Sequence, residues 1–242
     1  MEQFEKVLKP TEGMYYILCD GKNGEQILKM VSNKTRYFTK ITSEDREKVG
    51  RWLKEQRGST QEERKFLFWV RMALLSINYD YWIATMEPTV IDKRIHYSKG
   101  TIVGEKFSVA EWKRLANEYA PELGSRLAKQ SELFLWYALR IVNKLWTLDY
   151  VANDSSSAGN YKDAPETYKR KENAGARLCG GYFDGQGNTR KLVSDILCGA
   201  VGGYYQVTGL VHPVANISEG FSENMHFGDS NYVGVLVLTR CE

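Results

Sequence analysis

The feature that most constrains the fold lies at residues 124–141 and reads GSRLAKQSELFLWYALRI. Gly124, Arg126 and Leu127 come first, and a short polar stretch follows them. Apolar residues at helical spacing begin at residue 131, so this part predicts a helix. Glu132 is the one acidic residue on that hydrophobic sequence. The elements on either side decide which fold contains such a helix.

Residues 1–78 predict a small module of strands and helices. Within residues 14–41, apolar runs on either side of the turn sequence DGKNGEQ predict a hairpin or a pair of strands. Two helices are predicted next, at residues 42–56 and 59–77. A module of about 75 residues is marginally stable alone, so we expect it to pack against something else, such as another subunit.

Both of these helices start with capping signatures. The candidate caps are Thr42 or Ser43 for the first helix, and Ser59 or Thr60 for the second. Glu62 or Glu63 stands near the third position of the second helix. Apolar residues cover a broad face of that helix: Phe66, Leu67, Trp69, Val70, Ala73 and Leu74.

Residues 79–150 predict a strand and two further helices. Alternating polar and apolar residues at 79–91 predict the strand. Residues 108–120 predict an amphipathic helix, with Ser108 as its cap and Glu111 at the third position. The second helix of this part is the one that begins at residue 131.

The composition changes after residue 150. Thirteen of the 21 glycines lie in residues 151–242, and aromatic residues there alternate with Asn, Ser and Asp. Helical periodicity is mostly absent, which predicts short strands and long, structured loops. The apolar run GVLVLT at residues 234–239 predicts a buried strand near the C-terminus.

In this order, the elements resemble the C-type-lectin-like fold of formylglycine-generating factors. They also resemble the ligand-binding proteins of phages and bacteria that are varied by diversity-generating retroelements. In this family a Gly-x-Arg-Leu-Pro-Thr-x-x-Glu-Trp motif opens the second helix. The matching positions here are Gly124, Arg126, Leu127 and Glu132, with the apolar Leu133 at the position of the Trp, whereas Ala128 and Lys129 replace Pro-Thr.

Two further stretches carry the resemblance, which covers residues 79–242. LCGGYFDGQGN at residues 178–188 is similar to the Arg-Gly-Gly-Ser-Trp element of the family. NYVGVLVLTR at residues 231–240 is similar to its closing Ile-Gly-Phe-Arg strand, with Val235 and Leu236 in place of Phe-Arg. The expected fold class is therefore α+β. A C-type-lectin-like domain of two helices, a small antiparallel sheet and long loops would follow the N-terminal module at 1–78.

We expect Arg126 to have a structural role. A buried or half-buried ion pair with Glu132, or with an acid near the C-terminus, would fix the second helix to the loop region. Such a pair favours a specific fold more than it adds stability. The opening motif is therefore interpreted as a mark of the fold and not as a catalytic site.

The sequence predicts no catalytic residue, metal site or cofactor. Sulfatase-modifying activity needs a late cysteine pair that binds copper, and Cys179 and Cys198 lack the sequence context of that pair. His96, His212 and His226 are scattered, without metal-ligand spacing. The turn DGQGNT at 184–189 has calcium-like oxygen spacing but lacks the later glycine and glutamate of a calcium loop.

Ligand binding is the function that remains. Tyrosine gives a large contact area at low entropic cost, and small polar residues give hydrogen bonds. The candidate binding residues are Tyr182, Tyr204, Tyr205, His212, Asn216, Phe221, Asn224, His226, Asn231 and Tyr232. The resemblance implies that the varied positions lie at about 202–232. For any one aromatic residue, packing in the core is the alternative.

The predicted function is non-enzymatic recognition of a glycan or protein on a bacterial surface by a phage or phage-derived virion protein. Residues 1–78 would attach it to other virion proteins, and we expect a homo-oligomer. The alternatives are a structural virion decoration protein and an enzyme of unrecognised class.

The bulk sequence excludes several partners and locations. The net charge is only +3 and no basic cluster is present, so no nucleic-acid partner is expected. No apolar run is long enough for a membrane span. The N-terminal sequence MEQFEKVLKPTEG has no apolar segment of a signal peptide. We therefore expect synthesis in the cytoplasm, and the resemblance to phage proteins implies association with a virion.

Overall fold

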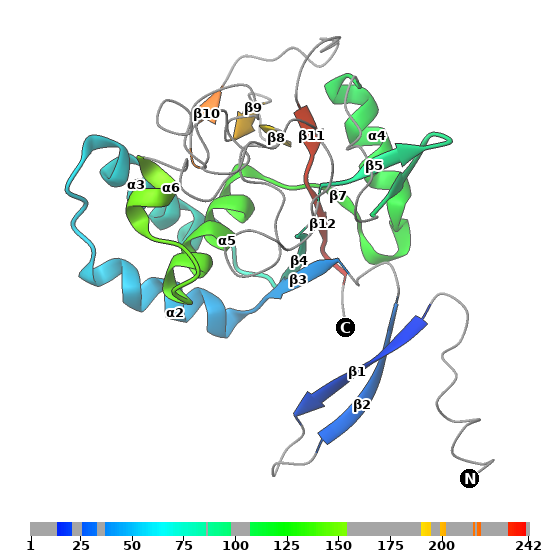
Figure 1. Cartoon of the computed structure of the whole chain (residues 1–242), viewed down its shortest axis with the longest axis horizontal. Helices are drawn as coiled ribbons and strands as arrows, with labels where there is room; N and C mark the ends of the chain where they lie inside the picture. Colours follow the sequence, from blue (N-terminus) through cyan, green and yellow to red (C-terminus); the bar gives the residue numbers. More distant parts are fainter. Residues whose placement is uncertain are drawn as a thin grey trace, which may run out of the picture. The chain divides into compact units, whose positions relative to one another are not determined.

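Figure 1 shows the computed structural model, which describes residues 14–20, 26–32, 37–85, 87–97, 107–153, 190–194, 199–201, 215, 217–218 and 232–240. The chain divides into two compact units, Met1–Phe38 and Thr39–Glu242. Helices and small, mainly antiparallel sheets are both present, so the expected α+β class is confirmed at this level. Within these ranges, no helix has the length and apolar character needed to cross a bilayer.

The first unit contains an antiparallel hairpin. Strand β1 (Met14–Asp20) pairs with β2 (Gln26–Ser32), in a register that runs from Met14 opposite Ser32 to Asp20 opposite Gln26. Both strands are rich in residues that favour β-structure, such as Tyr, Ile, Leu and Val. The hairpin predicted within residues 14–41 is confirmed.

A four-stranded sheet forms the centre of the second unit. Its strand order is β3 (Phe38–Ile41), β4 (Tyr81–Ala84), β12 (Leu236–Leu238) and β7 (Arg126–Leu127). Strand β12 pairs antiparallel with both of its neighbours. All three of its side chains are fully buried. The expected buried strand near the C-terminus is therefore present, and it lies inside the sheet.

Three helices build the main hydrophobic core. Helices α2 (Ser43–Glu55) and α3 (Gln61–Ser76) pack against α5 (Gln130–Val142). Nine consecutive residues of α5, from Glu132 to Arg140, are buried. A helix that is apolar all round must be covered on every side, and α2 and α3 supply part of that cover.

Because α2 and α3 pack against α5, the division of the chain into units differs from the predicted boundary between residues 78 and 79. The core cluster that contains α5 also contains buried residues of α2 and α3: Val49, Leu53, Phe66, Leu67, Val70 and Ala73. A boundary at residue 78 would cut through one continuous core. The structure divides instead after Phe38. The attachment role of residues 1–78 stays a prediction.

The capping boxes decide between the candidate caps. Thr42 caps α2 and pairs with Asp45, and Thr60 caps α3 and pairs with Glu63. Ser108 caps α4 (Val109–Tyr119) and pairs with Glu111. In each box the cap hydroxyl accepts from the backbone N–H three residues on, and the carboxylate accepts from the backbone N–H of the cap.

The strand predicted over residues 79–91 is divided in two. Strand β4 ends at Ala84, and β5 (Thr89–Ile91) forms a separate hairpin with β6 (Arg94–His96). Pro88 lies between β4 and β5. Proline lacks the backbone N–H that a continuous strand would use, so the alternating sequence there supports two short strands.

Four strands of the C-terminal part of the chain form a second sheet. Its order is β10 (Ile217–Ser218), β9 (Gly199–Val201), β8 (Arg190–Val193) and β11 (Tyr232–Gly234). Strands β8 and β11 are parallel, and the other neighbours are antiparallel. Strands β11 and β12 are separated only by Val235, so the end of the chain joins both sheets.

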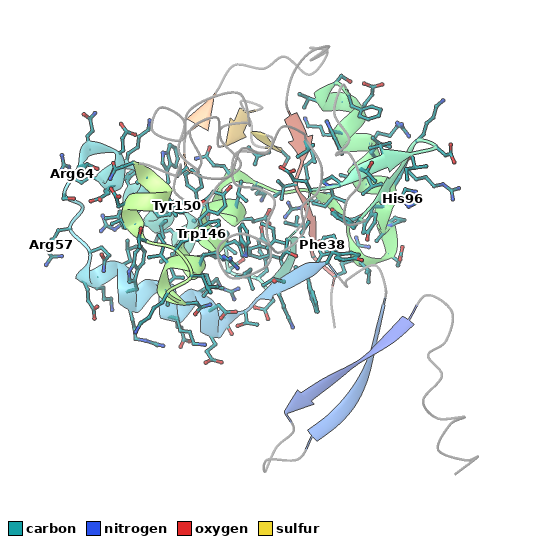
Figure 2. The ribbon with its side chains drawn as sticks, in the orientation of Figure 1. Phe38, Arg57, Arg64, His96, Trp146 and Tyr150 are labelled. Atoms are coloured by element: carbon teal, nitrogen blue, oxygen red, sulfur yellow. The ribbon has the colours of Figure 1, made fainter. Side chains whose placement is uncertain are left out.

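Aromatic rings fill the space between α5 and the short helix α6 (Leu148–Ala152). Trp146 lies 5.5 Å from Tyr137 and 5.6 Å from Tyr150, measured between ring centroids. The guanidinium of Arg140 stands 5.0 Å from the Trp146 ring. Figure 2 shows Trp146 and Tyr150 on the same side as α2 and α3, whereas α4 lies on the other side of β12 (Figure 1).

Candidate functional site

Of the two partners that the sequence left open for Arg126, the structure shows an ion pair with Glu132. Arg126 lies in β7, and Glu132 lies in the first turn of α5. Arg126 Nη1 donates to Glu132 Oε2 at 2.8 Å, and Nη2 donates to Oε1 at 2.5 Å. The Glu132 side chain is fully buried, and that of Arg126 is 27% exposed. The contact is the two-pronged geometry that makes arginine–carboxylate pairs strong.

Two further groups donate to the same carboxylate. The hydroxyl of Tyr79 donates to Glu132 Oε1 at 2.7 Å, and the backbone N–H of Lys129 donates to Oε2 at 2.7 Å. The hydroxyl of Tyr81 donates to the backbone oxygen of Glu132, also at 2.7 Å. A buried carboxylate is costly unless its lone pairs are satisfied, and here four donors satisfy it.

The surroundings keep the donors of this network protonated. Burial and the nearby Glu132 carboxylate raise the pKa of Tyr79 to about 12. Burial likewise raises the pKa of Tyr81 well above its ordinary value. Burial alone would lower the pKa of Arg126, but its contacts with Glu132 outweigh that effect and raise it. All three side chains therefore stay protonated near neutral pH, and their hydrogen bonds to Glu132 are kept there.

Gly124 connects this motif to the end of the chain. Its φ of +64° lies in the left-handed region, and a Cβ there would stand 2.6 Å from Thr239 Oγ1. Thr239 Oγ1 donates to the backbone oxygen of Gly124 at 3.1 Å. The backbone N–H groups of Thr239 and Arg240 both donate to the oxygen of Leu123. The glycine of the motif is therefore required for close contact with the closing strand.

The rest of the motif bridges the two sheets. Leu127 pairs with Leu236 across β7 and β12. The backbone N–H of Ala128 donates to the oxygen of Val235 at 2.7 Å. Ser194, directly after β8, donates to Ala128 through its backbone N–H and to Leu127 through its hydroxyl. A single short segment thus fixes the second sheet against the first.

Four strand ends meet at one end of the second sheet. In the register of the sheet, Lys191 near the start of β8 is opposite Val201 at the end of β9. Arg190 is opposite Tyr232, the first residue of β11, and Val201 is opposite Ile217, the first residue of β10. Neighbouring strands lie about 4.8 Å apart, so these four ends span roughly 15 Å.

Most of the predicted binding residues lie outside the described residues. These are Tyr182, Tyr204, Tyr205, His212, Asn216, Phe221, Asn224, His226 and Asn231. Tyr232 is described only as the first residue of β11.

Chain continuity still connects several predicted residues to the same sheet end. Tyr204 and Tyr205 follow Val201 by three and four residues, and Asn216 immediately precedes Ile217 in β10. Asn231 immediately precedes β11, and the segment that contains Tyr182 enters the sheet through β8.

The metal candidates remain separate or undescribed. In the part of the chain that the structure describes, no group of three or more His, Cys, Asp or Glu side chains is placed to hold a metal ion. His96 is exposed on β6 (Figure 2). The turn at residues 184–189, Cys179 and Cys198 lie outside the described residues.

Two features of the structure were not predicted from the sequence. Tyr79 donates to Glu132 from 53 residues away, and no local pattern marks such a partner. Helix α3 exposes Phe68, Met72 and Leu75, opposite its buried face. Their spacing of four and then three residues is visible in the sequence, and it is the signal that would have found them.

The described residues therefore show a rigid scaffold and the end of the second sheet at which the candidate binding segments join it. Arg126 and Glu132 belong to the scaffold, and the predicted binding residues belong to segments that join one end of the second sheet. No known protein-family model matches the sequence, and no curated protein matches it significantly.

Proposed function

We propose that this chain is a non-enzymatic ligand-binding protein with a C-type-lectin-like fold. Its binding surface would be formed by the segments attached to one end of the β10-β9-β8-β11 sheet. We propose further that it is a phage or phage-derived virion protein that recognises a glycan or a protein on a bacterial surface. The Gly-x-Arg-Leu motif and the order of the elements support this kind of fold.

One observation carries the proposal, namely the meeting of four strand ends within roughly 15 Å. The register of Arg190, Val201, Ile217 and Tyr232 gives this arrangement. Binding residues are typically found on loops that a rigid scaffold positions. The buried network around Glu132 and the hydrogen bonds of Ser194 supply such a scaffold.

The residues that adjoin these strand ends in the sequence have the chemistry of a recognition surface. Tyr204, Tyr205 and Tyr232 offer rigid rings with a polar tip, and Asn216 and Asn231 offer amide donors and acceptors. The same mixture is typical of binding loops that adapt to varied ligands. This mixture of tyrosine and asparagine supports ligand binding, a function that does not require a titrating side chain.

The test measures binding of the full-length chain to bacterial cells and to a panel of surface glycans, with and without calcium. The test variant is Tyr204→Ala combined with Tyr205→Ala. We expect it to weaken binding by at least about tenfold, as the loss of aromatic anchors does at other interfaces. The control is Phe68→Ala, which removes an exposed aromatic ring from α3 and should leave ligand binding unchanged.

Two results would overturn the proposal. The first is that the full-length chain binds neither cells nor glycans. In that case, tight binding to a capsid or tail protein would identify a structural decoration protein instead. The second is that the Tyr204 and Tyr205 variant binds as the unmodified chain does. Calcium dependence would separately indicate that a bound calcium ion takes part in ligand binding.

A further inference from the structure

The outward face of α3 carries an apolar stripe. Phe68, Met72 and Leu75 are 50%, 43% and 77% exposed. They are three of the five large hydrophobic side chains that are exposed in the described part of the chain. These side chains are not part of the hydrophobic core, because α3 packs against the core through its opposite face. Exposed apolar side chains that gather on one face indicate a contact surface.

The spacing of the stripe is that of a helix–helix seam. Phe68 and Met72 are four residues apart, and Met72 and Leu75 are three apart. These are the successive d, a and d positions of a heptad repeat. At 3.6 residues per turn, the three side chains fall within about 60° of one another. A helix that lies on a membrane presents a wider apolar face, so this narrow stripe suits one partner helix.

Basic side chains border the stripe. In the same heptad register, Arg64 and Arg71 take the g positions and Lys65 takes an a position. All three are exposed, and Figure 2 shows Arg64 at the outer surface near the start of α3. Among the described residues, no ion pair includes any of the three, and Arg64 donates through Nη1 to the backbone oxygens of Gly58 and Ser59. Of the two acids in the first turn, Glu63 is held on the buried side by the capping box. Glu62 is exposed at an e position, one heptad before Trp69, so the basic residues outnumber the acidic ones three to one around the stripe.

We propose that this face of α3 docks an acidic amphipathic helix of a partner protein. Apolar side chains of the partner would pack on the stripe, and its Asp or Glu residues would lie opposite Arg64 and Arg71. Charges at the g and e positions select the partner in such seams. The proposal goes beyond the proposed ligand-binding function and uses a different surface of the chain.

A second copy of α3 does not meet these requirements. Antiparallel pairing would set the g-position arginines of one copy against those of the other, which is repulsive. Parallel pairing would set Arg64 opposite Trp69 and Arg71 opposite Ser76. Neither arrangement supplies an acidic partner for the arginines. Charge complementarity therefore favours an acidic helix over self-association.

The test uses the full-length chain and two matched helical peptides. Both peptides carry Leu at the a and d positions; one has Glu at its e and g positions, and the other has Lys there. We expect the Glu peptide to bind, and the Lys peptide to bind at least about tenfold more weakly, in a fluorescence anisotropy titration. Leu75→Ala should weaken binding of the Glu peptide by about tenfold.

Charge reversal makes the test sharper. Arg71→Glu should shift the preference of the chain from the Glu peptide toward the Lys peptide. The control is Lys54→Glu, which makes the same change of charge at an exposed position of α2 and should leave the preference unaltered. Tyr204→Ala with Tyr205→Ala should bind the Glu peptide normally, so failure of the ligand-binding proposal would be distinguishable.

Three outcomes would overturn the docking proposal. Equal binding of the two peptides would show that Arg64 and Arg71 do not select an acidic helix. Binding to phosphatidylserine vesicles without binding to the Glu peptide would identify a membrane surface instead. Sedimentation that shows self-association of the chain, lost in Leu75→Ala, would assign the stripe to a second copy.

Discussion

Glu132 is the buried charge on which the interior of this protein depends. Arg126 balances it, and Arg126→Met would leave the carboxylate with Tyr79 and the Lys129 N–H as its donors among the described residues. We expect this variant to lose about 3–5 kcal/mol of unfolding free energy, because an uncompensated buried charge is strongly destabilising. Urea unfolding followed by circular dichroism measures the loss.

An exposed pair supplies the control for this prediction. Arg114 Nη1 lies 2.7 Å from Glu118 Oε2 on the surface of α4. Arg114→Met should cost no more than about 0.5 kcal/mol. Arg126→Met combined with Glu132→Leu should recover much of the loss, since an apolar pair can replace a buried ion pair. A cost for Arg126→Met as small as that for Arg114→Met would contradict the structural role.

Gly234 permits the close packing of the closing strand. A Cβ at this position would lie 2.7 Å from Leu127 Cδ2 and 2.8 Å from Trp112 Cε3. Both of these side chains are fully buried. We expect Gly234→Ala to cost about 1–3 kcal/mol, because overpacking forces buried side chains out of place. The measurement is again the midpoint of urea unfolding.

A second glycine tests whether the cost comes from packing. Gly50 lies within α2, and its Cβ would meet no heavy atom closer than 3.9 Å. Gly50→Ala should therefore stabilise the protein by about 0.5–1 kcal/mol, because alanine is the better helix former. If both substitutions changed stability in the same direction, the close approach at Gly234 would not be the cause.

At the level of the element, the start of α3 contains a titrating group. Burial alone would raise the pKa of Glu63, but hydrogen bonds outweigh that effect and lower the pKa below 4.5. They come from the side chain and backbone N–H of Ser59, from the Thr60 N–H and from the Asn153 amide. This helix start is thus held to Asn153, at the C-terminal end of α6, by the Glu63 carboxylate and by the Thr60 hydroxyl.

The lowered pKa predicts how α3 responds to acid. A group whose folded-state pKa is depressed adds stability above its unfolded value, and that stability is lost as the pH falls through the folded value. Glu63→Gln should lack this loss below about pH 4.5 and should cost about 1 kcal/mol at neutral pH. Urea unfolding at pH 7 and at successive lower pH values measures both effects.

Glu62 gives the matched comparison. It is exposed in the first turn of the same helix, one residue before Glu63. Glu62→Gln should keep the acid-dependent loss that Glu63→Gln removes. An unchanged pH dependence in Glu63→Gln would show that its carboxylate does not contribute in this way.

Local sequence patterns predicted the elements whose causes are local. The three capping boxes, the hairpin β1–β2 and the helix α5 depend on residues a few positions apart. The Arg126–Glu132 pair is also local, since its partners are only six positions apart in the sequence. The division between β4 and β5 was missed, because alternation continues through residues 79–91 while Pro88 removes a backbone donor.

At the level of the whole molecule, the long-range contacts could not be predicted from the sequence. Periodicity shows that α2 and α3 have apolar faces, but it does not show that α5 covers them. It also does not show that β12 lies between β4 and β7, because strands distant in the chain pair through non-local contacts. For the candidate site, composition suggested the binding residues, whereas the shared sheet end became visible only from the strand register.

The continuous core makes a clear prediction about truncation. Residues 37–242 keep all of β3, α2 and α3, and we expect them to unfold cooperatively in urea. Residues 79–242 lose every one of these elements, including Ile41 and Val70, which are fully buried. Their removal would expose one side of α5, which is buried over nine consecutive residues. We therefore expect 79–242 to show no cooperative transition.

The two fragments thus separate the two possible divisions of the chain. Cooperative unfolding of 79–242 would show that the C-terminal part folds alone and would restore the boundary between residues 78 and 79. Failure of 37–242 to fold would show that the first unit is needed as well. If only 37–242 folds, α2 and α3 belong to the scaffold of the sheet end that carries the proposed binding segments. The partner helix proposed for α3 would then dock on the same folded unit that carries the proposed binding segments.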